Sequence, residues 1–153
     1  MSRVQLALNV DDLDTAVSFY SSLFGTAPAK LRPGYANFAV VDPPLKLVLI
    51  EKSGSGGSIN HLGVEVGDSA SVQAEIERLT VAGLVPAPES GTCCYATQDK
   101  AWVSGPDGEQ WEVYTVLADS PTFFGADTGC CGPAQASADS PAVPQDAQSG
   151  CSQ

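Results

Sequence analysis

Apolar residues in the first fifty positions alternate, then recur at helical spacing, and then alternate again. Every even position of residues 4–10 carries valine or leucine, which is typical of a strand with one buried face. The next apolar positions predict a helix over 13–24, with Asp11 or Asp12 as its N-cap and Gly25 as its end. Turn residues then separate three strand-like runs, at 27–31, 35–41 and 45–51.

The same order of elements returns after a Gly- and Ser-rich linker at 53–58. A strand at 59–66 comes before a helix that begins at Asp68 or Ser69 and ends at Gly83. Gln5 aligns with His61, and Asp12 with Asp68, at one fixed offset, so the chain carries an internal repeat. Four strand-like runs complete the second half, at 84–87, 93–97, 101–104 and 110–116.

This repeat predicts an α+β fold of two paired β-α-β-β-β modules, at about residues 1–52 and 58–117. Each module is a small sheet with a helix on one face, and two open faces can pair into a metal-binding cleft. Together the modules make one domain, 1–117. The remainder, 118–153, is rich in Ala, Ser, Pro and Gly and is predicted to be a mostly disordered tail.

Strand alternation predicts which polar side chains enter the cleft. The apolar positions of the first strand pack on the helix, so Gln5 points into the cleft. By the same reasoning His61 points inward from 59–66, and Glu112 and Tyr114 point inward from 110–116. Gln5, His61 and Glu112 therefore converge, and their nitrogen and oxygen atoms suit a hard or borderline metal ion.

Two of the five cysteines, Cys93 and Cys94, are adjacent in the second half. Adjacent cysteines rarely bond to each other because the ring that they would close is strained. The odd number of cysteines and a second adjacent pair, Cys130 and Cys131, also fit a disulfide framework poorly. Two neighbouring thiols suit a thiophilic ion instead, such as trivalent arsenic, cadmium or copper(I).

The composition limits the classes of partner. The 153 residues are enough for one domain with a core, since 43% of them are hydrophobic. A formal net charge of −11 argues against nucleic acid or an anionic membrane surface as a partner. No apolar run approaches the length of a membrane span, and the first residues enter a strand rather than a signal peptide. We therefore expect a cytoplasmic protein whose cysteines are thiols.

Two paired modules of this kind resemble the vicinal oxygen chelate superfamily. Its members include glyoxalase I, extradiol dioxygenases, fosfomycin-resistance enzymes and bleomycin-binding proteins, and the resemblance covers roughly residues 3–117. Three segments resemble, more specifically, the cadmium-induced and organoarsenical carbon–arsenic lyase family. They are Thr92-Cys93-Cys94-Tyr95-Ala96, Asp99-Lys100-x-Trp102-Val103 and Pro106-Asp107-Gly108-x-x-Trp111-Glu112-Val113-Tyr114.

This resemblance implies cleavage of a carbon–arsenic bond at a non-haem Fe(II) ion, with molecular oxygen as co-substrate. The substrates would be trivalent organoarsenicals, namely methylarsenite and reduced aromatic arsenicals, and arsenite would be released. His61 and Glu112 match two of the family's iron ligands, and Cys93 and Cys94 match its substrate-binding pair. Gln5 takes the position that is usually a histidine in such sites, and its assignment rests on the repeat and on strand alternation.

Further expectations concern the surroundings of the site. Three aromatic residues are expected to line the cleft: Tyr95, Trp102 and Tyr114. Cys130 and Cys131 in the tail would give accessory arsenic capture. The protein is expected to act on its small-molecule substrate as a monomer or a homodimer.

Other functions remain open on the sequence. A metal-dependent isomerase of the glyoxalase type would need a fourth ligand, and Glu51 stands near its expected position, but that chemistry gives no role to Cys93 and Cys94. A binding protein could hold arsenite or cadmium through its thiols without catalysis. A fosfomycin thiol transferase ranks lower, because the chain has only seven Lys and Arg residues and no cationic cluster for a phosphonate.

Overall fold

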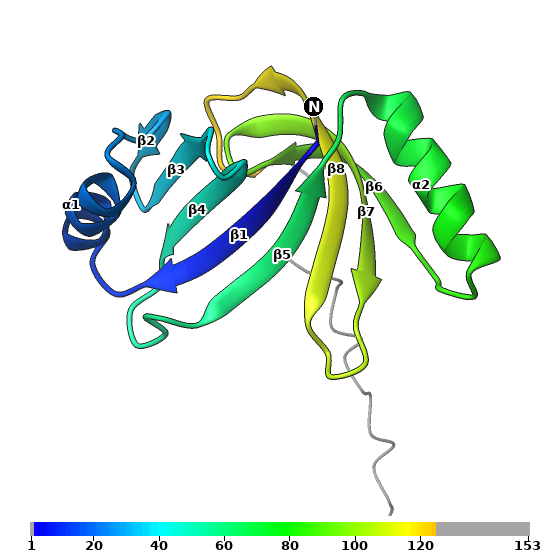
Figure 1. Ribbon diagram of the computed structural model, residues 1–153, viewed down its shortest axis with the longest axis horizontal. Helices are drawn as coiled ribbons and strands as arrows, with labels where there is room; N and C mark the ends of the chain where they lie inside the picture. Colours follow the sequence, from blue (N-terminus) through cyan, green and yellow to red (C-terminus); the bar gives the residue numbers. More distant parts are fainter. Residues whose placement is uncertain (1, 125–153) are drawn as a thin grey trace, which may run out of the picture.

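Two similar halves form one eight-stranded sheet in the computed structural model, which describes residues 2–124 (Figure 1). The first half consists of β1 (Arg3–Val10), α1 (Leu13–Phe24), β2 (Lys30–Arg32), β3 (Tyr35–Val40) and β4 (Leu45–Glu51). The second half consists of β5 (Ile59–Glu65), α2 (Ser69–Val81), β6 (Ala87–Cys93), β7 (Ala96–Ser104) and β8 (Gln110–Asp119). Each half follows the order strand, helix and three strands.

The strand order is β2-β3-β4-β1-β5-β8-β7-β6, so the halves meet where β1 and β5 run antiparallel at the centre of the sheet. Each half contains one parallel pair, β1 with β4 and β5 with β8. The sheet is curved, with α1 against β3 and β4 at one end and α2 against β7 and β8 at the other (Figure 1). The inner face brings Val48 of β4 close to Cys94 beyond β6. The predicted α+β fold of two paired modules is confirmed.

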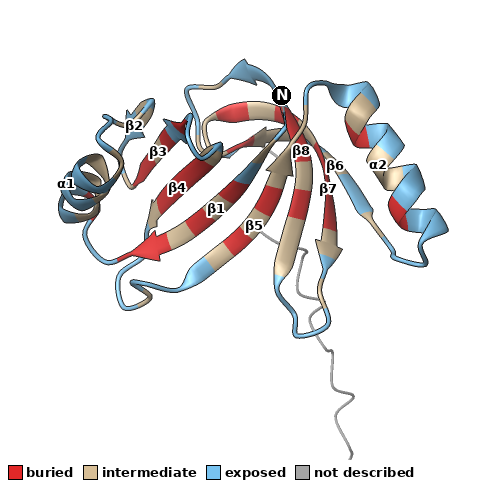
Figure 2. Ribbon diagram, in the orientation of Figure 1, coloured by how far each residue is buried: buried red, intermediate tan, exposed pale blue. Residues whose placement is uncertain are grey.

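The main hydrophobic core lies between α1 and the helix-facing side of the first half. Phe38 and Leu47 are 0% and 1% exposed and pack with Leu13 at the start of α1. Buried residues run along the central strands, whereas the outer faces of both helices are exposed (Figure 2). Leu6, Leu8 and Val10 of β1 belong to this layer, as their pattern predicts, whereas Val4 is 50% exposed. The odd positions of β1 are left for the inner face.

Capping residues set the ends of the helices. The Asp12 carboxylate accepts a hydrogen bond from the Thr15 amide at 2.7 Å, and Asp68 accepts one from the Ser71 amide at the same distance. Gly25 ends α1 with φ of 61°, a conformation that glycine adopts without strain. Neither helix in residues 2–124 is long and apolar enough to cross a membrane.

The second half differs from the sequence prediction between 84 and 104. The sequence predicts three short strands there, but the structure has two long ones, β6 and β7, joined as a hairpin. The predicted break at 98–100 is wrong because Gln98 and Lys100 face the interior, at 5% and 3% exposure. Two polar residues on the inner face hide the period-two pattern of β7. In the first half, β2 likewise covers Lys30–Arg32 rather than 27–31.

Ordered structure also continues past position 117. β8 extends to Asp119, and Phe124 forms an isolated bridge with Cys93. The predicted linker at 53–58 is fixed to the end of β1 by a hydrogen bond, which the Gly54 amide donates to Asp11 Oδ1 at 2.7 Å. The rest of the predicted tail, with Cys130 and Cys131, lies outside the described residues.

Truncating Phe38 tests the core. Replacing Phe38 by alanine should lower the free energy of unfolding by about 3–5 kcal/mol, because the side chain is fully buried and its removal leaves a cavity. Phe19 is the matched control: it is 59% exposed on α1, so Phe19→Ala should cost less than about 1 kcal/mol. Urea unfolding measures both, and equal losses would contradict this assignment of the core.

Candidate functional site

The inner face of the sheet encloses a small cavity in which both groups of predicted site residues meet. Its volume is about 10 Å³, close to the space needed by one water molecule. Residues of both halves line it: Gln5, Tyr35, Lys46, Val48, His61, Cys93, Cys94, Gln98, Lys100, Trp102 and Glu112. The adjacent thiols and the predicted metal ligands therefore share one enclosed space.

Gln5 on β1, His61 on β5 and Glu112 on β8 converge, as strand alternation predicts. Gln5 Nε2 lies 3.1 Å from His61 Nε2 and 2.6 Å from Glu112 Oε1, and the last two atoms are 3.4 Å apart. Each residue is at most 4% exposed. Gly63 lies between Gln5 and Glu112 in the sheet, and a Cβ there would be 3.0 Å from Glu112 Cγ. A glycine at this position is what allows the carboxylate to approach Gln5.

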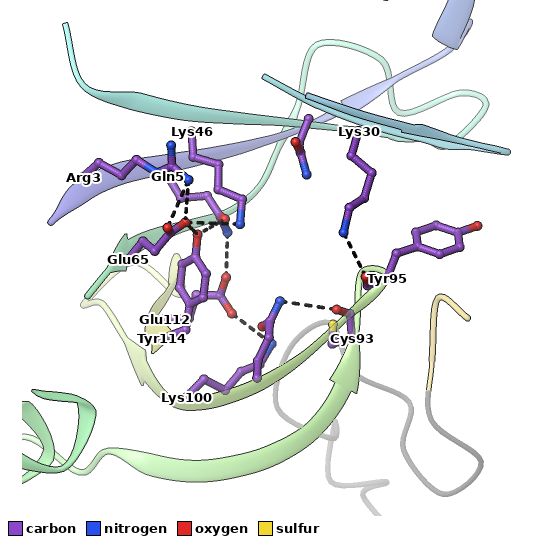
Figure 3. Close-up of polar contacts among 12 residues, drawn as sticks. Arg3, Gln5, Lys30, Lys46, Glu65, Cys93, Tyr95, Lys100, Glu112 and Tyr114 are labelled. Atoms are coloured by element: carbon purple, nitrogen blue, oxygen red, sulfur yellow. Dashed lines mark hydrogen bonds and ion pairs between the residues drawn. The ribbon is translucent and has the colours of Figure 1, made fainter. Parts of the chain in front are cut away.

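The hydrogen bonds behind Gln5 bear on whether this set fits a metal ion. Tyr114 Oη lies 2.5 Å from Gln5 Oε1 and 2.9 Å from Glu65 Oε2 (Figure 3). Burial raises the pKa of Glu65, but the charge of Lys46 and other contacts outweigh it and lower the pKa, so Glu65 is an ionised acceptor. One hydroxyl proton thus faces two acceptors, and it can serve only one of them.

Turning the Gln5 carboxamide by half a turn resolves this conflict. Its Nε2 then donates to Tyr114 Oη, and the hydroxyl proton goes to Glu65. Gln5 Oε1 in turn faces His61 Nε2 and Glu112 Oε1, which puts three lone-pair atoms together. Such a group repels itself unless a cation lies between its members, and this arrangement of residues therefore fits a bound metal.

The spacing of the three atoms fits as well. The separations of 2.6, 3.1 and 3.4 Å lie around the value of about 3.0 Å that separates adjacent ligand atoms of an octahedral divalent ion with bonds of about 2.1 Å. Three ligands on one face leave open positions, as in the facial sites of non-haem iron enzymes. Within residues 2–124 no three His, Cys, Asp or Glu side chains make a metal site, so the Gln5 amide is an essential member of this set.

Lys100 stabilises the negative charge of Glu112 among the three candidate ligands. Its Nζ lies 3.1 Å from Glu112 Oε2, on the side away from Gln5 (Figure 3). The same Nζ lies 5.2 Å from the centre of the Trp102 ring. Burial raises the pKa of Glu112, but its contacts with His61 and with the Lys100 ammonium outweigh burial and lower the pKa to about 2. Burial also lowers the pKa of Lys100, and the Glu112 charge more than reverses this. The pair is therefore ionised at neutral pH.

The thiol pair lies at the two-residue turn between β6 and β7. Cys93 pairs with Ala96, and the turn residues Cys94 and Tyr95 have φ of 55° and 61°. Positive φ at both central positions is typical of a type I′ hairpin turn, which favours Asn-Gly and costs other residues about 1–2 kcal/mol each. Side chains of neighbouring strand residues point to opposite faces. The turn instead brings the two Sγ atoms to 3.3 Å, too far for a disulfide bond.

Contacts from the first half and from residues beyond β8 hold this turn. Lys30 of the first half donates to the Tyr95 carbonyl at 3.0 Å (Figure 3). Lys30 also contacts the Asp119 carboxylate. The Cys94 amide donates to the Phe123 carbonyl at 2.8 Å. Residues 120–124, which the sequence assigns to the tail, therefore help to position Cys94.

The three aromatic residues expected at the cleft take different places. Trp102 lines the cavity, with its ring edge-on to His61 at 5.4 Å. Tyr114 is fully buried and lies behind Gln5. Tyr95 packs on Phe123 at the tip of the hairpin and donates to the Pro33 carbonyl, so it does not face the metal ligands.

Glu51 is not a neighbour of the candidate ligands. Its Oε1 accepts from the Leu13 amide at 3.1 Å, so it caps the start of α1 on the helix-facing side of the sheet. The inner face of β4 carries Lys46 and Val48 instead, and both line the cavity. Lys46 pairs with Glu65 at 3.3 Å. A fourth carboxylate ligand is therefore absent from this strand of the described chain.

Two buried lysines, Lys46 and Lys100, were not predicted from the sequence. Strand alternation could have placed Lys46, since it pairs with Gln5 and shares its face. Lys100 was missed because it lies in the break that was predicted between the strand-like runs 93–97 and 101–104. A second cavity, of about 270 Å³, adjoins the first and shares Tyr35, Lys46, Cys94 and Gln98 with it, so one of the two thiols, that of Cys94, borders a larger space.

Known proteins resemble this chain in sequence and in fold. It is 72% identical to the cadmium-induced protein CadI of Mycobacterium tuberculosis, over 80% of this chain and 82% of that protein. It is 59% identical to a trivalent organoarsenical cleaving enzyme of Thermomonospora curvata, over 87% and 90% of the two chains. The Mn(II)-bound glyoxalase of Novosphingobium aromaticivorans shares the fold, with a TM-score of 0.56 and 20% identity over 78% of this chain and 42% of that one.

These likenesses agree with the family expected from the sequence motifs. Residues 3–113 match the Glyoxalase/Bleomycin resistance protein/Dioxygenase superfamily. This range covers most of both halves of the sheet. The chain therefore belongs to this superfamily, and within it to the group of the cadmium-induced proteins and the trivalent organoarsenical cleaving enzymes.

Proposed function

We propose that this protein is a non-haem Fe(II)-dependent dioxygenase that cleaves the carbon–arsenic bond of trivalent organoarsenicals and releases arsenite. The observation that carries the proposal is the shared cavity, in which two adjacent thiols lie beside a buried set of one nitrogen and two oxygen donors. The name of the relative from Thermomonospora curvata supports the same reaction.

The thiols would bind the substrate. Trivalent arsenic with one carbon substituent has two exchangeable positions, and two thiolates can fill both because arsenic is a soft acceptor. The Sγ atoms of Cys93 and Cys94 lie 3.3 Å apart before binding, so little rearrangement of the turn is needed. Cys94 borders the larger cavity, which supplies an approach for the arsenical.

Gln5, His61 and Glu112 would hold the metal. Bound Fe(II) would supply the activation of molecular oxygen, and its open positions are the reason for a three-ligand site. Trp102 and the buried walls keep bulk water out of the cavity, and Lys100 holds the Glu112 charge in place. Binding through sulfur would keep the arsenical close to the metal without occupying Gln5, His61 or Glu112. Such proximity can account for a large part of the rate of a catalysed reaction.

The reaction balances with oxygen as the sole oxidant. Methylarsenite, CH3As(OH)2, and one O2 give formaldehyde and arsenite, As(OH)3. The methyl carbon is oxidised and oxygen is reduced, while arsenic stays trivalent. The broken bond is C–As, and one oxygen atom ends on each product. An aryl substrate would give a hydroxylated ring and arsenite. That balance also takes two electrons and two protons, which two external thiols would supply as they form a disulfide.

The two rival functions fit the site less well. A four-ligand isomerase lacks its last carboxylate, because Glu51 caps α1 and the inner positions of β4 carry Lys46 and Val48. A protein that only sequesters arsenic would need the thiols, but it would have no use for the buried triad.

Serine at Cys93 or Cys94 tests the thiol clamp. Either Cys93→Ser or Cys94→Ser should abolish tight methylarsenite binding and slow turnover by about 100-fold or more, because one sulfur ligand is lost. Ferrous iron should still bind, since Gln5, His61 and Glu112 are unchanged.

The matched control is the double change Cys130→Ser and Cys131→Ser, which removes the other adjacent pair. This variant should keep turnover at saturating substrate. Calorimetric titration with methylarsenite and arsenic speciation measure both effects. Unchanged binding in either single variant would disprove the clamp.

Oxygen dependence tests the chemistry. The full chain, loaded with ferrous iron without air and mixed with methylarsenite, should release no arsenite until oxygen is admitted. Formaldehyde and arsenite should then appear in equal amounts. His61→Ala should bind methylarsenite but release nothing, because the thiols remain and a metal ligand is lost. Arsenite release under strict anaerobiosis would rule out the dioxygenase.

Lys100 should stabilise the protein through Glu112. Lys100→Met should lower the free energy of unfolding by about 3–5 kcal/mol at neutral pH, because a buried carboxylate loses its partner. Adding Glu112→Gln should recover most of this loss. The depressed pKa of Glu112 stabilises the fold above about 4.5, and this contribution is lost as the pH falls toward about 2. The difference in the free energy of unfolding between wild type and Lys100→Met should therefore become smaller as the pH falls through this range. Urea unfolding at several pH values measures it, and a difference that stays constant would contradict the role of Lys100.

A further inference from the structure

Asn60 is the extra residue of a β-bulge directly before His61. Ala7 of β1 pairs with His61, whereas Leu8 pairs with Ile59, so no residue of β1 lies opposite Asn60. In a regular strand, Asn60 and His61 would point to opposite faces. A bulge can re-aim one side chain, and Asn60 Oδ1 lies 2.8 Å from His61 Nδ1.

A chain of hydrogen bonds fixes the direction of this contact. Ser58 Oγ donates to the Ser55 carbonyl at 2.6 Å, and a carbonyl can only accept. Ser58 Oγ therefore accepts from Asn9 Nδ2 at 2.9 Å, which leaves Asn9 Oδ1 to accept from Asn60 Nδ2 at 2.8 Å. Asn60 Oδ1 is then the atom that faces His61 Nδ1, so the ring must donate from Nδ1.

This direction matters because the His61 ring has a rival acceptor. Glu112 Oε1 lies 3.4 Å from His61 Nε2, and a proton on Nε2 would satisfy that carboxylate. The same proton would occupy the lone pair that faces Gln5 and Glu112, and the nitrogen could no longer bind a metal. The two sides of the ring therefore compete for one proton.

We propose that Asn60, oriented by Asn9 and Ser58, is a positioning residue that holds the His61 proton on Nδ1 and leaves the Nε2 lone pair directed at the metal site. The relay connects the loop between β4 and β5, the strand β1 and the bulge of β5. The inference rests on the proposed function for the role of His61 as a ligand, but the placement of the proton can be tested without any metal.

The experiment uses the metal-free full-length chain labelled with nitrogen-15. His61 is the only histidine of the sequence, so a long-range proton–nitrogen correlation spectrum reports a single ring. At mildly alkaline pH the wild type should show a protonated Nδ1 and a bare Nε2. Asn60→Leu, which is similar in size but has no polar atoms, should move the ring largely or partly to the Nε2-protonated form.

Two variants serve as comparisons. Asn60→Asp keeps an oxygen acceptor beside Nδ1 and should retain the wild-type pattern. Asn37→Leu removes an asparagine that bonds to the Tyr35 hydroxyl at 3.0 Å rather than to His61, and it should leave the pattern unchanged. If Asn60→Leu does not fold, as judged by circular dichroism, Asn60→Ala is read in its place with the same expectations.

Ferrous iron alone is the second probe. Anaerobic competition with a coloured chelator should give an affinity about 10–100-fold weaker for Asn60→Leu than for wild type, with Asn60→Asp restoring most of it. A wild-type nitrogen pattern in both Asn60→Leu and Asn60→Ala would overturn the inference. A shifted pattern in a protein whose wild type binds no iron would support the relay and instead defeat the proposed function.

Discussion

The negative charge of Glu112 is the constraint on which the interior of this protein depends. A carboxylate at 3% exposure has lost its water and needs a compensating charge. Lys100 of β7 supplies that charge at Oε2, whereas Oε1 faces the Gln5 and His61 side chains of β1 and β5. Three strands from both halves are therefore tied to one charge, which gives the inner face a fixed geometry.

Each candidate ligand is also oriented from the side away from the metal site. Tyr114 lies behind Gln5, Asn60 lies behind His61, and Lys100 lies behind Glu112. These partners do not point at the place where Gln5, His61 and Glu112 converge. They determine which atom of each of these three side chains points there. Outer contacts of this kind usually tune a metal site. The ordered polar network explains why so many polar side chains are buried in so small a domain.

The thiol pair is organised by a different device. Its side chains meet because a two-residue turn holds Cys94 and Tyr95 at positive φ, a conformation that neither residue prefers. Local strain of this kind is typical of functional sites and persists only where the surroundings determine it. Here the surroundings include Lys30 of the first half and Phe123 beyond the last strand. The soft and the hard donors are thus built separately and meet in one cavity.

Much of this arrangement can be predicted from the sequence, because strand alternation is a local rule. The repeat and the apolar period were enough to predict the two halves and to turn Gln5, His61 and Glu112 toward one another. Adjacent thiols were also visible at once. The rule failed wherever tertiary contacts override local pattern. The buried Gln98 and Lys100 hid the alternating pattern of β7, and the bulge gave Asn60 a direction that alternation forbids. Glu51 obeys the rule, since it shares the helix-facing parity of Leu47 and Leu49 and caps α1.

The sequence by itself determined which donor groups the chain carries and which strand faces present them, since residue types and their period are written in it. Only the tertiary structure decided which charges face each other, which ring nitrogen of His61 is left bare, and how the two sulfurs come together. These features depend on contacts between residues far apart in the chain, and such contacts exist only once the sheet has closed around them.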